Sequence, residues 1–371
     1  GNNMTEQSGA APNSQQLAHY GQAGELFAIT LVNLLLKVVT AGIYHFWAKT
    51  RVRRYVWSHT SFAGENFEYT GHGVQLLKGF IFALIFLSPL ALIWGAPRFF
   101  PMQEYGQFAQ LWLLLSLGVY PLLLWLIGFA RFAARRYKLG HTRWRGIRFG
   151  MTGSARSHGN KMLGQTLLIS ITFGIYTPYM RSNLTANLLN NSWFGDQRFR
   201  YTGTGSGLIK RFWGFVVISI LLGAIWGFTV QPFLASLLEK MQSDGGSSGL
   251  LLQLTAVAVG LASYVPWAIA WLWFRAGEIR YYVANTTLDD VQYSIASLNT
   301  FEFIWLWTSN VGALVLTLGL AYPWVAVRSA RYICDHLRVI GELDFASIGQ
   351  SSQEVLKSGE GLAEALDIGA I

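Results

Sequence analysis

The chain has 371 residues, of which 52% are hydrophobic and 13% are charged, and its formal net charge is +9. This apolar composition excludes an ordinary soluble globular protein and indicates a protein embedded in a membrane. The positive charge lies beside apolar segments, not on a basic face with interleaved aromatic residues, so nucleic-acid binding is not expected. The single cysteine, Cys334, excludes an internal disulfide and a cysteine-based metal cluster.

The two ends of the chain are predicted to be tails. Residues 1–20 are polar and are expected to be disordered, and residues 351–371 are expected to form a C-terminal tail. Met4 is the expected natural start, which makes residues 1–3 a remnant of cloning. The first apolar stretch begins near Leu26, is interrupted by Lys37 and lacks the pattern of a cleavable signal peptide.

Four segments are apolar and long enough to cross the roughly 30 Å hydrocarbon layer as helices. They cover residues 76–94, 109–130, 212–230 and 250–274, and none contains an acidic residue. Residues 131–161 are rich in arginine and free of acids, whereas the connections after the first and third segments carry little basic charge. The positive-inside rule therefore places the basic segments and the N-terminus on the cytoplasmic side.

Short stretches in this basic layer alternate polar and apolar residues with the two-residue period of a β-strand. They lie at residues 67–70, 144–151, 199–202 and 291–296. We interpret them as small cytoplasmic β-hairpins, and plain connecting loops are the alternative.

Three further apolar segments are broken by glycine near their middle, at residues 42–44, 174–178 and 319–323. Each segment begins and ends in the basic layer, which favours hairpins that re-enter the membrane. Glycine and proline are tolerated at membrane depth where the freed backbone groups are buried in protein or line a cavity. Ordinary spanning helices are the alternative.

Polar residues inside apolar helices are candidate functional groups, and here they are confined to the three broken segments. If the hairpins meet near the molecular axis, these side chains line a polar cavity. The alternative is hydrogen bonding between helices. The candidate cavity-lining residues are Asn33, Lys37, Thr40, Thr172, Asn310 and Thr317.

The broken segments alternate with pairs of crossings and with arginine-rich units in a regular order. This order predicts two tandem membrane repeats, residues 21–155 and 156–299, followed by a half repeat at residues 300–350. The predicted fold is an all-α polytopic membrane protein with small cytoplasmic β-hairpins, four spanning helices and three re-entrant segments.

Several linked motifs occur in a fixed order along the chain. They are GELF at 24–27, TAGIYHFW at 40–47, RVRRY at 51–55 and FEYTGHG at 67–73. The second is repeated as TFGIYTPY at 172–179, and the fourth as FRYTGTG at 199–205. Together with the ending GEGLAEALDIG, these motifs resemble the YjgN family of bacterial inner-membrane proteins. The resemblance implies a location in the inner membrane. It implies no activity and no catalytic or cofactor-binding residues.

A glycine-rich turn precedes two of the spanning segments, and a cation follows about one and a half turns into each helix. Backbone amides at a helix N-terminus and such a cation can hold a phosphate or carboxylate, for which a lipid headgroup is the natural source at this depth. The alternative is a plain turn with the lysines reaching to the interface. The candidate residues for lipid or anion binding are Gly71, Gly73, Lys78, Gly203, Gly205, Lys210 and Arg211.

The seven histidines form no metal-ligand spacing and no catalytic motif is present, so an enzyme, a cofactor and a metal site are not expected. We predict transport or lipid handling through a site between the repeats, with membrane lipids bearing anionic headgroups as partners. The alternative is a membrane scaffold that recruits partners through its basic cytoplasmic face.

Overall fold

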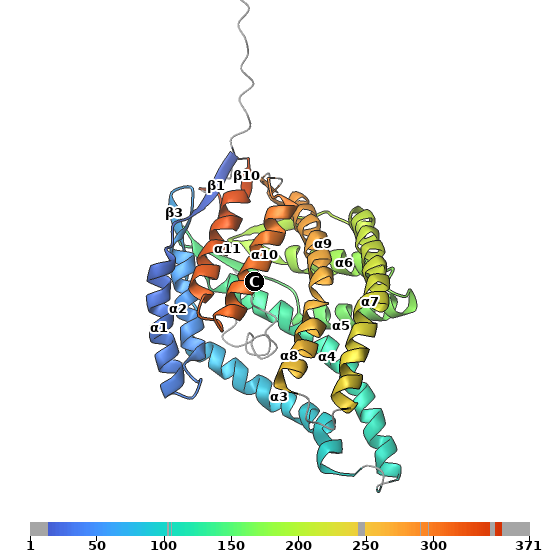
Figure 1. Cartoon of the computed structure of the whole chain (residues 1–371). Helices are drawn as coiled ribbons and strands as arrows, with labels where there is room; N and C mark the ends of the chain where they lie inside the picture. Colours follow the sequence, from blue (N-terminus) through green and yellow to red (C-terminus); the bar gives the residue numbers. More distant parts are fainter. Residues whose placement is uncertain are drawn as a thin grey trace, which may run out of the picture.

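A computed structural model of the chain describes residues 14–101, 104, 106–243, 249–289, 291–295, 297–341 and 346–350. Residues 1–13 of the predicted N-terminal tail and the whole predicted C-terminal tail, 351–371, lie outside these described residues. Short strands and helices alternate along the chain (Figure 1). The strands are β1 Ser14–His19, β2 Thr60–Phe62, β3 Glu65–Tyr69, β4 Thr142–Trp144, β5 Ile147–Met151, β6 Ser192–Phe194, β7 Gln197–Tyr201, β8 Thr286–Leu288, β9 Val291–Ser294 and β10 Arg338–Ile340. The helices are α1 Ala23–Val39, α2 His45–Ser58, α3 Gly73–Phe99, α4 Gln107–Gly140, α5 Ala155–Ile171, α6 Thr177–Leu189, η2 Gly205–Leu208, α7 Ile209–Ser243, α8 Leu250–Ala262, α9 Val265–Ala284, α10 Thr300–Leu316 and α11 Tyr322–His336.

The strands form one closed antiparallel barrel at one end of the molecule. They follow one another around the barrel in chain order, and β1 closes it by pairing with both β10 and β2. Gln15 pairs with Val339 on one side of β1, and Ala18 pairs with Ser61 on the other. The expectation of an all-α fold with small separate hairpins is therefore wrong, because β1 to β10 make a single closed sheet.

The barrel escapes detection in the sequence because its strands are short and their closure is not local. The even-numbered strands contain only three residues each, which is too short for an alternating pattern to be seen. The stretches predicted to be hairpins overlap β3, β5, β7 and β9. The segment Ser14–His19, predicted to be part of a disordered tail, instead supplies the strand that closes the barrel.

Apolar side chains fill the barrel. Their interior cluster consists of Phe62, Trp144, Phe194, Leu288, Val291, Val339 and Ile348. Ile348 comes from the segment after β10, and this segment is fixed to the barrel because the Asp196 amide donates a hydrogen bond to the Gly349 carbonyl at 3.1 Å. The interior is thus a packed core, as in other small barrels, and not an open pore.

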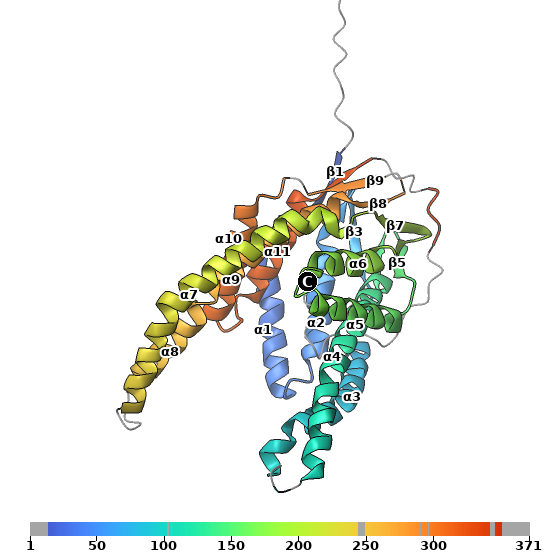
Figure 2. The same ribbon diagram turned by 90° about the vertical axis from the view of Figure 1, so that its right-hand side faces the viewer.

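Every second connection around the barrel is a helical hairpin, and the hairpins lie on the same side of the barrel (Figure 2). α1–α2 joins β1 to β2, α3–α4 joins β3 to β4, α5–α6 joins β5 to β6, and α10–α11 joins β9 to β10. Between β7 and β8 the chain runs out through η2 and α7 and returns through α8 and α9. Each hairpin therefore leaves and rejoins the barrel between neighbouring strands.

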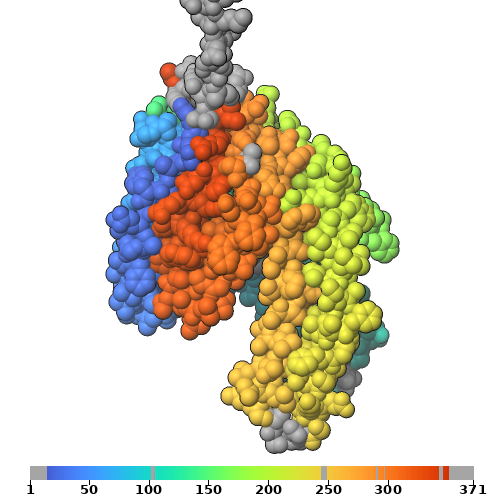
Figure 3. Space-filling view, turned by 45° about the horizontal axis from the view of Figure 1, so that its top comes forward, coloured from blue at the N-terminus to red at the C-terminus, as the bar shows by residue number. Residues whose placement is uncertain are grey.

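Four helical stretches of the described chain are long and apolar enough to cross a membrane, namely α3, α4, Gly205–Ser243 and Leu250–Ala284. They contain the four segments predicted to span, and they have the length and apolar composition that spanning requires. Many of their large apolar side chains point outward, such as Phe228, which is 86% exposed. An apolar surface of this extent is suited to lipid rather than water. The two long hairpins diverge away from the barrel (Figure 2), and the arm of α7 and α8 projects beyond the body of the molecule (Figure 3).

The three glycine-broken segments are short helical hairpins that share one kind of turn. At Thr40, Thr172 and Thr317 the hydroxyl donates to the carbonyl four residues earlier and accepts from the amide four residues later. The next residue has φ of +53°, and the glycine after it has φ between +87° and +91°, which glycine adopts without steric cost. The tips are apolar and exposed, with Phe173 96% and Leu318 93% exposed. Since both legs end at the barrel, this form agrees with the re-entrant interpretation.

Most hairpins rejoin the barrel through a recurring sequence, Arg-Tyr-x-x-x-His/Asn. At the end of the returning helix, Nδ1 of His59, His141 and His336 lies 2.8 Å from the carbonyl oxygen of the tyrosine four residues earlier. Asn285 donates from Nδ2 to Tyr281 in the same way, also at 2.8 Å. The Tyr55, Tyr137 and Tyr281 carbonyls also accept the backbone N–H of the same His or Asn, so the side chain adds a second hydrogen bond at the end of the helix.

The arginine of the same motif fixes one hairpin to the start of the next. Arg54 donates to the Gly71 carbonyl before α3, Arg136 to Gly153 before α5, Arg280 to Leu298 before α10, and Arg331 to Gly21 before α1. The last of these bonds joins the final hairpin to the first. Four of the five junctions between neighbouring hairpins are therefore joined by an arginine and a backbone carbonyl, and the bonds of the described residues include no such arginine between α6 and η2.

Candidate functional site

A cavity of about 870 Å³ lies between the helical hairpins, next to the barrel. Its walls come from α2, α4, α5, α6 and α9, and the barrel residues Leu17, Phe67 and Phe149 border it. Its volume is within the range of small-molecule binding sites. The charged and polar residues that line it include Arg131, Arg135, Lys138, His158, Arg181, Thr185, Arg275, Glu278 and Tyr282.

One wall of the cavity is the cationic face of α4. Arg131, Arg135 and Lys138 follow the i, i+4, i+7 spacing that places side chains on one face of a helix. Arg135 is oriented by a hydrogen bond from its Nε to Ser192 Oγ at 3.1 Å. Among the residues that the structure describes, no carboxylate forms an ion pair with Arg131 or Arg135. Arg131 and Arg135 therefore offer positive charge that no carboxylate of the described residues pairs with.

The opposite wall holds a buried carboxylate, Glu278, which is only 1% exposed. Arg181 Nε donates to both of its oxygens, at 3.0 and 2.9 Å, and Arg275 donates to one of them at 2.8 Å. The Arg181 guanidinium also lies 4.8 Å from the centre of the Trp271 ring. A buried carboxylate is stable only when it is paired in this way.

Glu278 was not among the residues expected at this site. The predicted spanning segment ends at residue 274, but α9 continues to Ala284 and carries the glutamate with it. The lining residues Arg131, Arg181 and Arg275 each precede a helix-ending His or Asn by ten positions, at His141, Asn191 and Asn285. This spacing is the sequence signal that would have brought the three arginines together.

His158 lines the cavity at the start of α5 and is kept neutral by its surroundings. Its side chain is buried, and Asn187 Nδ2 donates to its Nδ1 at 2.7 Å. Burial, followed by the charges of Lys161 and Arg131, lowers the pKa of His158 to about 4. At neutral pH this imidazole therefore adds no positive charge to the cavity.

Comparison with known proteins gives the chain a family but no activity. Residues 14–365 match a family described as bacterial protein of unknown function, DUF898. The chain belongs to this family. It is 23% identical over 370 residues to inner membrane protein YjgN of Salmonella typhimurium, covering 88% of this chain and 89% of the relative. It is 20% identical over 372 residues to inner membrane protein YjgN of Escherichia coli K12, covering 89% and 90%. No solved structure matches the chain.

These relatives confirm the resemblance inferred from the motifs, and their names agree with the four helices that are long and apolar enough to cross a membrane. The DUF898 match begins at residue 14, where β1 starts, and covers every described strand and helix. The barrel with its attached hairpins is therefore the unit that the family shares.

The glycine-rich turns predicted to bind an anion are tightly packed. A side chain at Gly71 would meet the ring of Tyr69, and one at Gly203 would meet the ring of Tyr201. Gly73 is similarly close to Trp47. This packing explains why glycine occupies these positions without reference to a ligand.

The remaining members of that predicted site lie apart from the central cavity. Lys78 and Lys210 are exposed, and Gly205 packs against the backbone of Tyr179. Arg211 donates to the Trp273 carbonyl, and its guanidinium lies 4.2 Å from the centre of that residue's ring. Anion binding at these two turns stays a prediction, which the structure neither supports with a cavity nor contradicts.

The predicted cavity-lining residues connect the two legs of their own hairpins. Arg51 donates to Asn33 Oδ1 at 3.3 Å, and Arg328 donates to Asn310 Oδ1 at 3.0 Å. Thr40, Thr172 and Thr317 stabilise the turns, and Lys37 is half-buried on α1. None of the predicted residues lines the central cavity.

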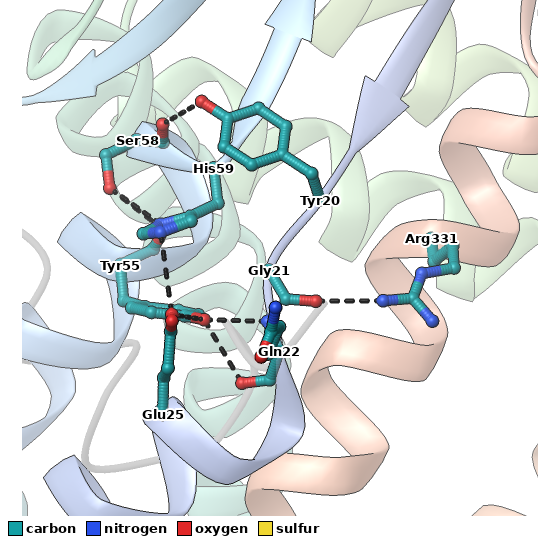
Figure 4. A network of polar contacts seen from close by, with 8 residues as sticks. All are labelled: Tyr20, Gly21, Gln22, Glu25, Tyr55, Ser58, His59 and Arg331. Atoms are coloured by element: carbon teal, nitrogen blue, oxygen red, sulfur yellow. Dashed lines mark hydrogen bonds and ion pairs between the residues drawn. The ribbon is translucent and has the colours of Figure 1, made fainter.

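A polar network fixes the first hairpin to the barrel and to the last hairpin (Figure 4). The Tyr55 hydroxyl donates to the Glu25 carboxylate and accepts from the Gln22 amide, both at 2.8 Å. The His59 ring stacks on Tyr55 with the ring centres 4.0 Å apart. Arg331 reaches across from α11 to the Gly21 carbonyl at 2.8 Å. The network holds the start of α1 between α2 and α11, a structural role.

Proposed function

We propose that this inner-membrane-type protein binds an anionic group, such as the phosphate of a lipid headgroup, in the central cavity and moves or presents it within the membrane. The observation that carries the proposal is that Arg131 and Arg135 on α4 line the cavity with no ion pair to a carboxylate of the described residues. Of the six charged side chains that line the cavity among the described residues, five are cations and only Glu278 is an anion. Arginine is well suited to bind phosphate through paired N–H donors.

The arrangement of the walls supports a ligand that comes from the membrane. The barrel next to the cavity is filled by its own side chains, so it provides no open path for a water-soluble substrate. The two long hairpins diverge on the side away from the barrel, where their exposed apolar residues suit lipid (Figure 2). Trp57, Phe149 and Met180 give the cavity apolar wall surface next to the arginines.

We also infer that the barrel faces the cytoplasm. Its strands carry Arg143, Arg148, Arg198, Arg200 and Arg338, whereas the far ends of the long hairpins carry few cations. This asymmetry is the pattern of the positive-inside rule.

Binding can be tested with purified protein and two phosphate probes. One is phosphatidylglycerol in phosphatidylcholine nanodiscs, and the other is inorganic phosphate added to protein in detergent. We expect Arg131→Gln to weaken phosphatidylglycerol binding by about tenfold or more, since one charge-assisted hydrogen bond is worth about 1.5–3 kcal/mol. Arg143→Gln is the matched control, because Arg143 is an exposed arginine on β4 outside the cavity.

The outcomes separate the candidate functions. Binding of the lipid but not of inorganic phosphate would assign the cavity to lipid handling. Binding of inorganic phosphate but not of the lipid would assign it to a soluble anion. Equal binding by wild type and Arg131→Gln would refute the proposed site. If only Arg143→Gln lost binding, the basic barrel surface would be the functional face, as the scaffold alternative predicts.

A further inference from the structure

A second groove runs along the outside of the molecule between the start of α1 and the α10–α11 hairpin. It consists of two adjoining hollows of about 520 and 680 Å³, which share Ala23 and Trp324. The hollow on the barrel side is lined by charged residues, and the hollow at the hairpin tip is lined by apolar ones. The groove thus changes from polar to apolar along the direction in which the hairpin leaves the barrel.

The charged hollow contains both signs of charge. Glu302 and Asp335 supply carboxylates, and Arg328 and Arg331 supply guanidinium groups. The Glu302 side chain is 57% exposed although it lies 3.6 Å from His336 Nε2, so its oxygens remain accessible. Arg328 and Arg331 each use one terminal nitrogen for the protein, and a guanidinium has further N–H donors. The hollow is therefore able to bind a cation and an anion together.

One more group in this hollow lacks a partner. The Tyr332 hydroxyl is buried and makes no hydrogen bond within the described part of the chain.

The adjoining hollow is lined mainly by apolar side chains, which suit contact with hydrocarbon. Phe27 borders it on α1, and Leu316, Leu318 and Leu320 border it on the hairpin tip. All four side chains are exposed on the described surface. The exposed rings of Trp305 and Trp324 lie along the charged hollow, and tryptophan is typical of the membrane interface.

We propose that this groove binds one phospholipid whose headgroup carries both a phosphate and a primary ammonium, with an acyl chain along the hairpin tip. The ammonium binds to Glu302 and Asp335, and the phosphate binds to Arg328 and Arg331. Two carboxylates balance two guanidinium groups, so the groove matches a zwitterion better than a headgroup with net negative charge. The proposal is independent of the central cavity, which has an excess of cations.

Lipid binding by the full-length protein can be measured by native mass spectrometry after exchange into nanodiscs. The discs contain phosphatidylethanolamine, phosphatidylglycerol or phosphatidylcholine in turn. We expect Glu302→Gln to reduce the retained phosphatidylethanolamine by about tenfold, the effect of losing one charge-assisted hydrogen bond. Glu65→Gln is the matched control, because Glu65 is also an exposed, ion-paired glutamate, 3.2 Å from Arg145 on the barrel.

A second pair of variants tests the acyl part without altering a charge. Leu318→Asn places a polar residue in the apolar hollow, and Phe173→Asn makes the same change at the matching turn position of the α5–α6 hairpin. Asparagine tolerates the positive φ that both positions share. We expect only Leu318→Asn to lose the bound lipid. Equal retention of the lipid by Leu318→Asn and Phe173→Asn would overturn the proposal. So would retention of phosphatidylethanolamine by Glu302→Gln at the wild-type level. A preference for phosphatidylglycerol over phosphatidylethanolamine that persists in Arg131→Gln would also overturn it.

Discussion

Replacing Glu278 by glutamine removes the only carboxylate that the described residues place in the central cavity. Arg181 and Arg275 together donate three hydrogen bonds to it, at 2.8–3.0 Å. Glutamine keeps the shape of the side chain but leaves two cations facing each other without a counter-charge. Removing one partner of a buried ion pair costs about 3–5 kcal/mol. At the roughly 2 °C per kcal/mol expected of a large chain, the melting temperature of Glu278→Gln should fall by about 6–10 °C.

The assay is thermal unfolding in detergent, followed by the fluorescence of the tryptophans, with Glu65→Gln as an exposed control that should lose at most about 1 kcal/mol. A triple variant with Arg181→Met, Glu278→Leu and Arg275→Met removes the whole charged group and should recover most of the lost stability. Glu278→Gln should also bind phosphatidylglycerol more tightly than wild type, because it raises the positive charge of the cavity. A loss below about 1 kcal/mol with unchanged lipid binding would refute this account of the cavity.

Three other predictions follow from single features. His158 binds a proton below pH 6.5 when unfolded but only near pH 4 when folded, so stability should fall as the pH drops through this window, by up to about 3 kcal/mol, and His158→Gln should abolish that dependence in melting curves. Gly205→Ala should cost about 1–3 kcal/mol because its Cβ would meet the Tyr179 backbone, whereas Gly164→Ala, which meets nothing, should be neutral or stabilising in the same unfolding assay. In intact cells, a cysteine at Arg145 on the barrel should react with a maleimide only after the inner membrane is permeabilised; labelling from the periplasm would reverse the proposed orientation.

Composition and local sequence pattern were sufficient to predict the helices and the short helical hairpins. Long apolar stretches predict the four long helices, and the glycine breaks predict the three short hairpins. These elements are detectable because their signal is repeated over many residues. Relatives named as inner membrane proteins agree with this level of prediction.

The barrel was not predictable in this way. A three-residue strand such as Thr142–Trp144 carries only one period of alternation, and the barrel closes by pairing residues far apart in the chain, such as Gln15 with Val339. Some of the arginines also have a structural role that their position in the sequence does not show. Arg54, Arg136, Arg280 and Arg331 look like topology determinants in the sequence, but in the structure each binds a backbone carbonyl and joins two hairpins.

The central cavity was missed for a related reason. Its cations belong to three different helices, α4, α6 and α9, which the barrel brings together although they are far apart in the chain. The polar residues expected to line a cavity, such as Asn33 and Asn310, are instead used to join the legs of single hairpins. Rarity of polar groups in apolar helices identifies residues under constraint, but it does not distinguish helix pairing from ligand binding.

The central claim is that the cationic face of α4 binds a phosphate-bearing ligand from the membrane. It is tested most directly by an experimental structure of the full-length protein in nanodiscs that contain phosphatidylglycerol. The account predicts headgroup density within hydrogen-bonding distance of Arg131 and Arg135, and its loss in Arg131→Gln. A cavity that contains only water or is closed by protein side chains, with the arginines turned away, would contradict the claim.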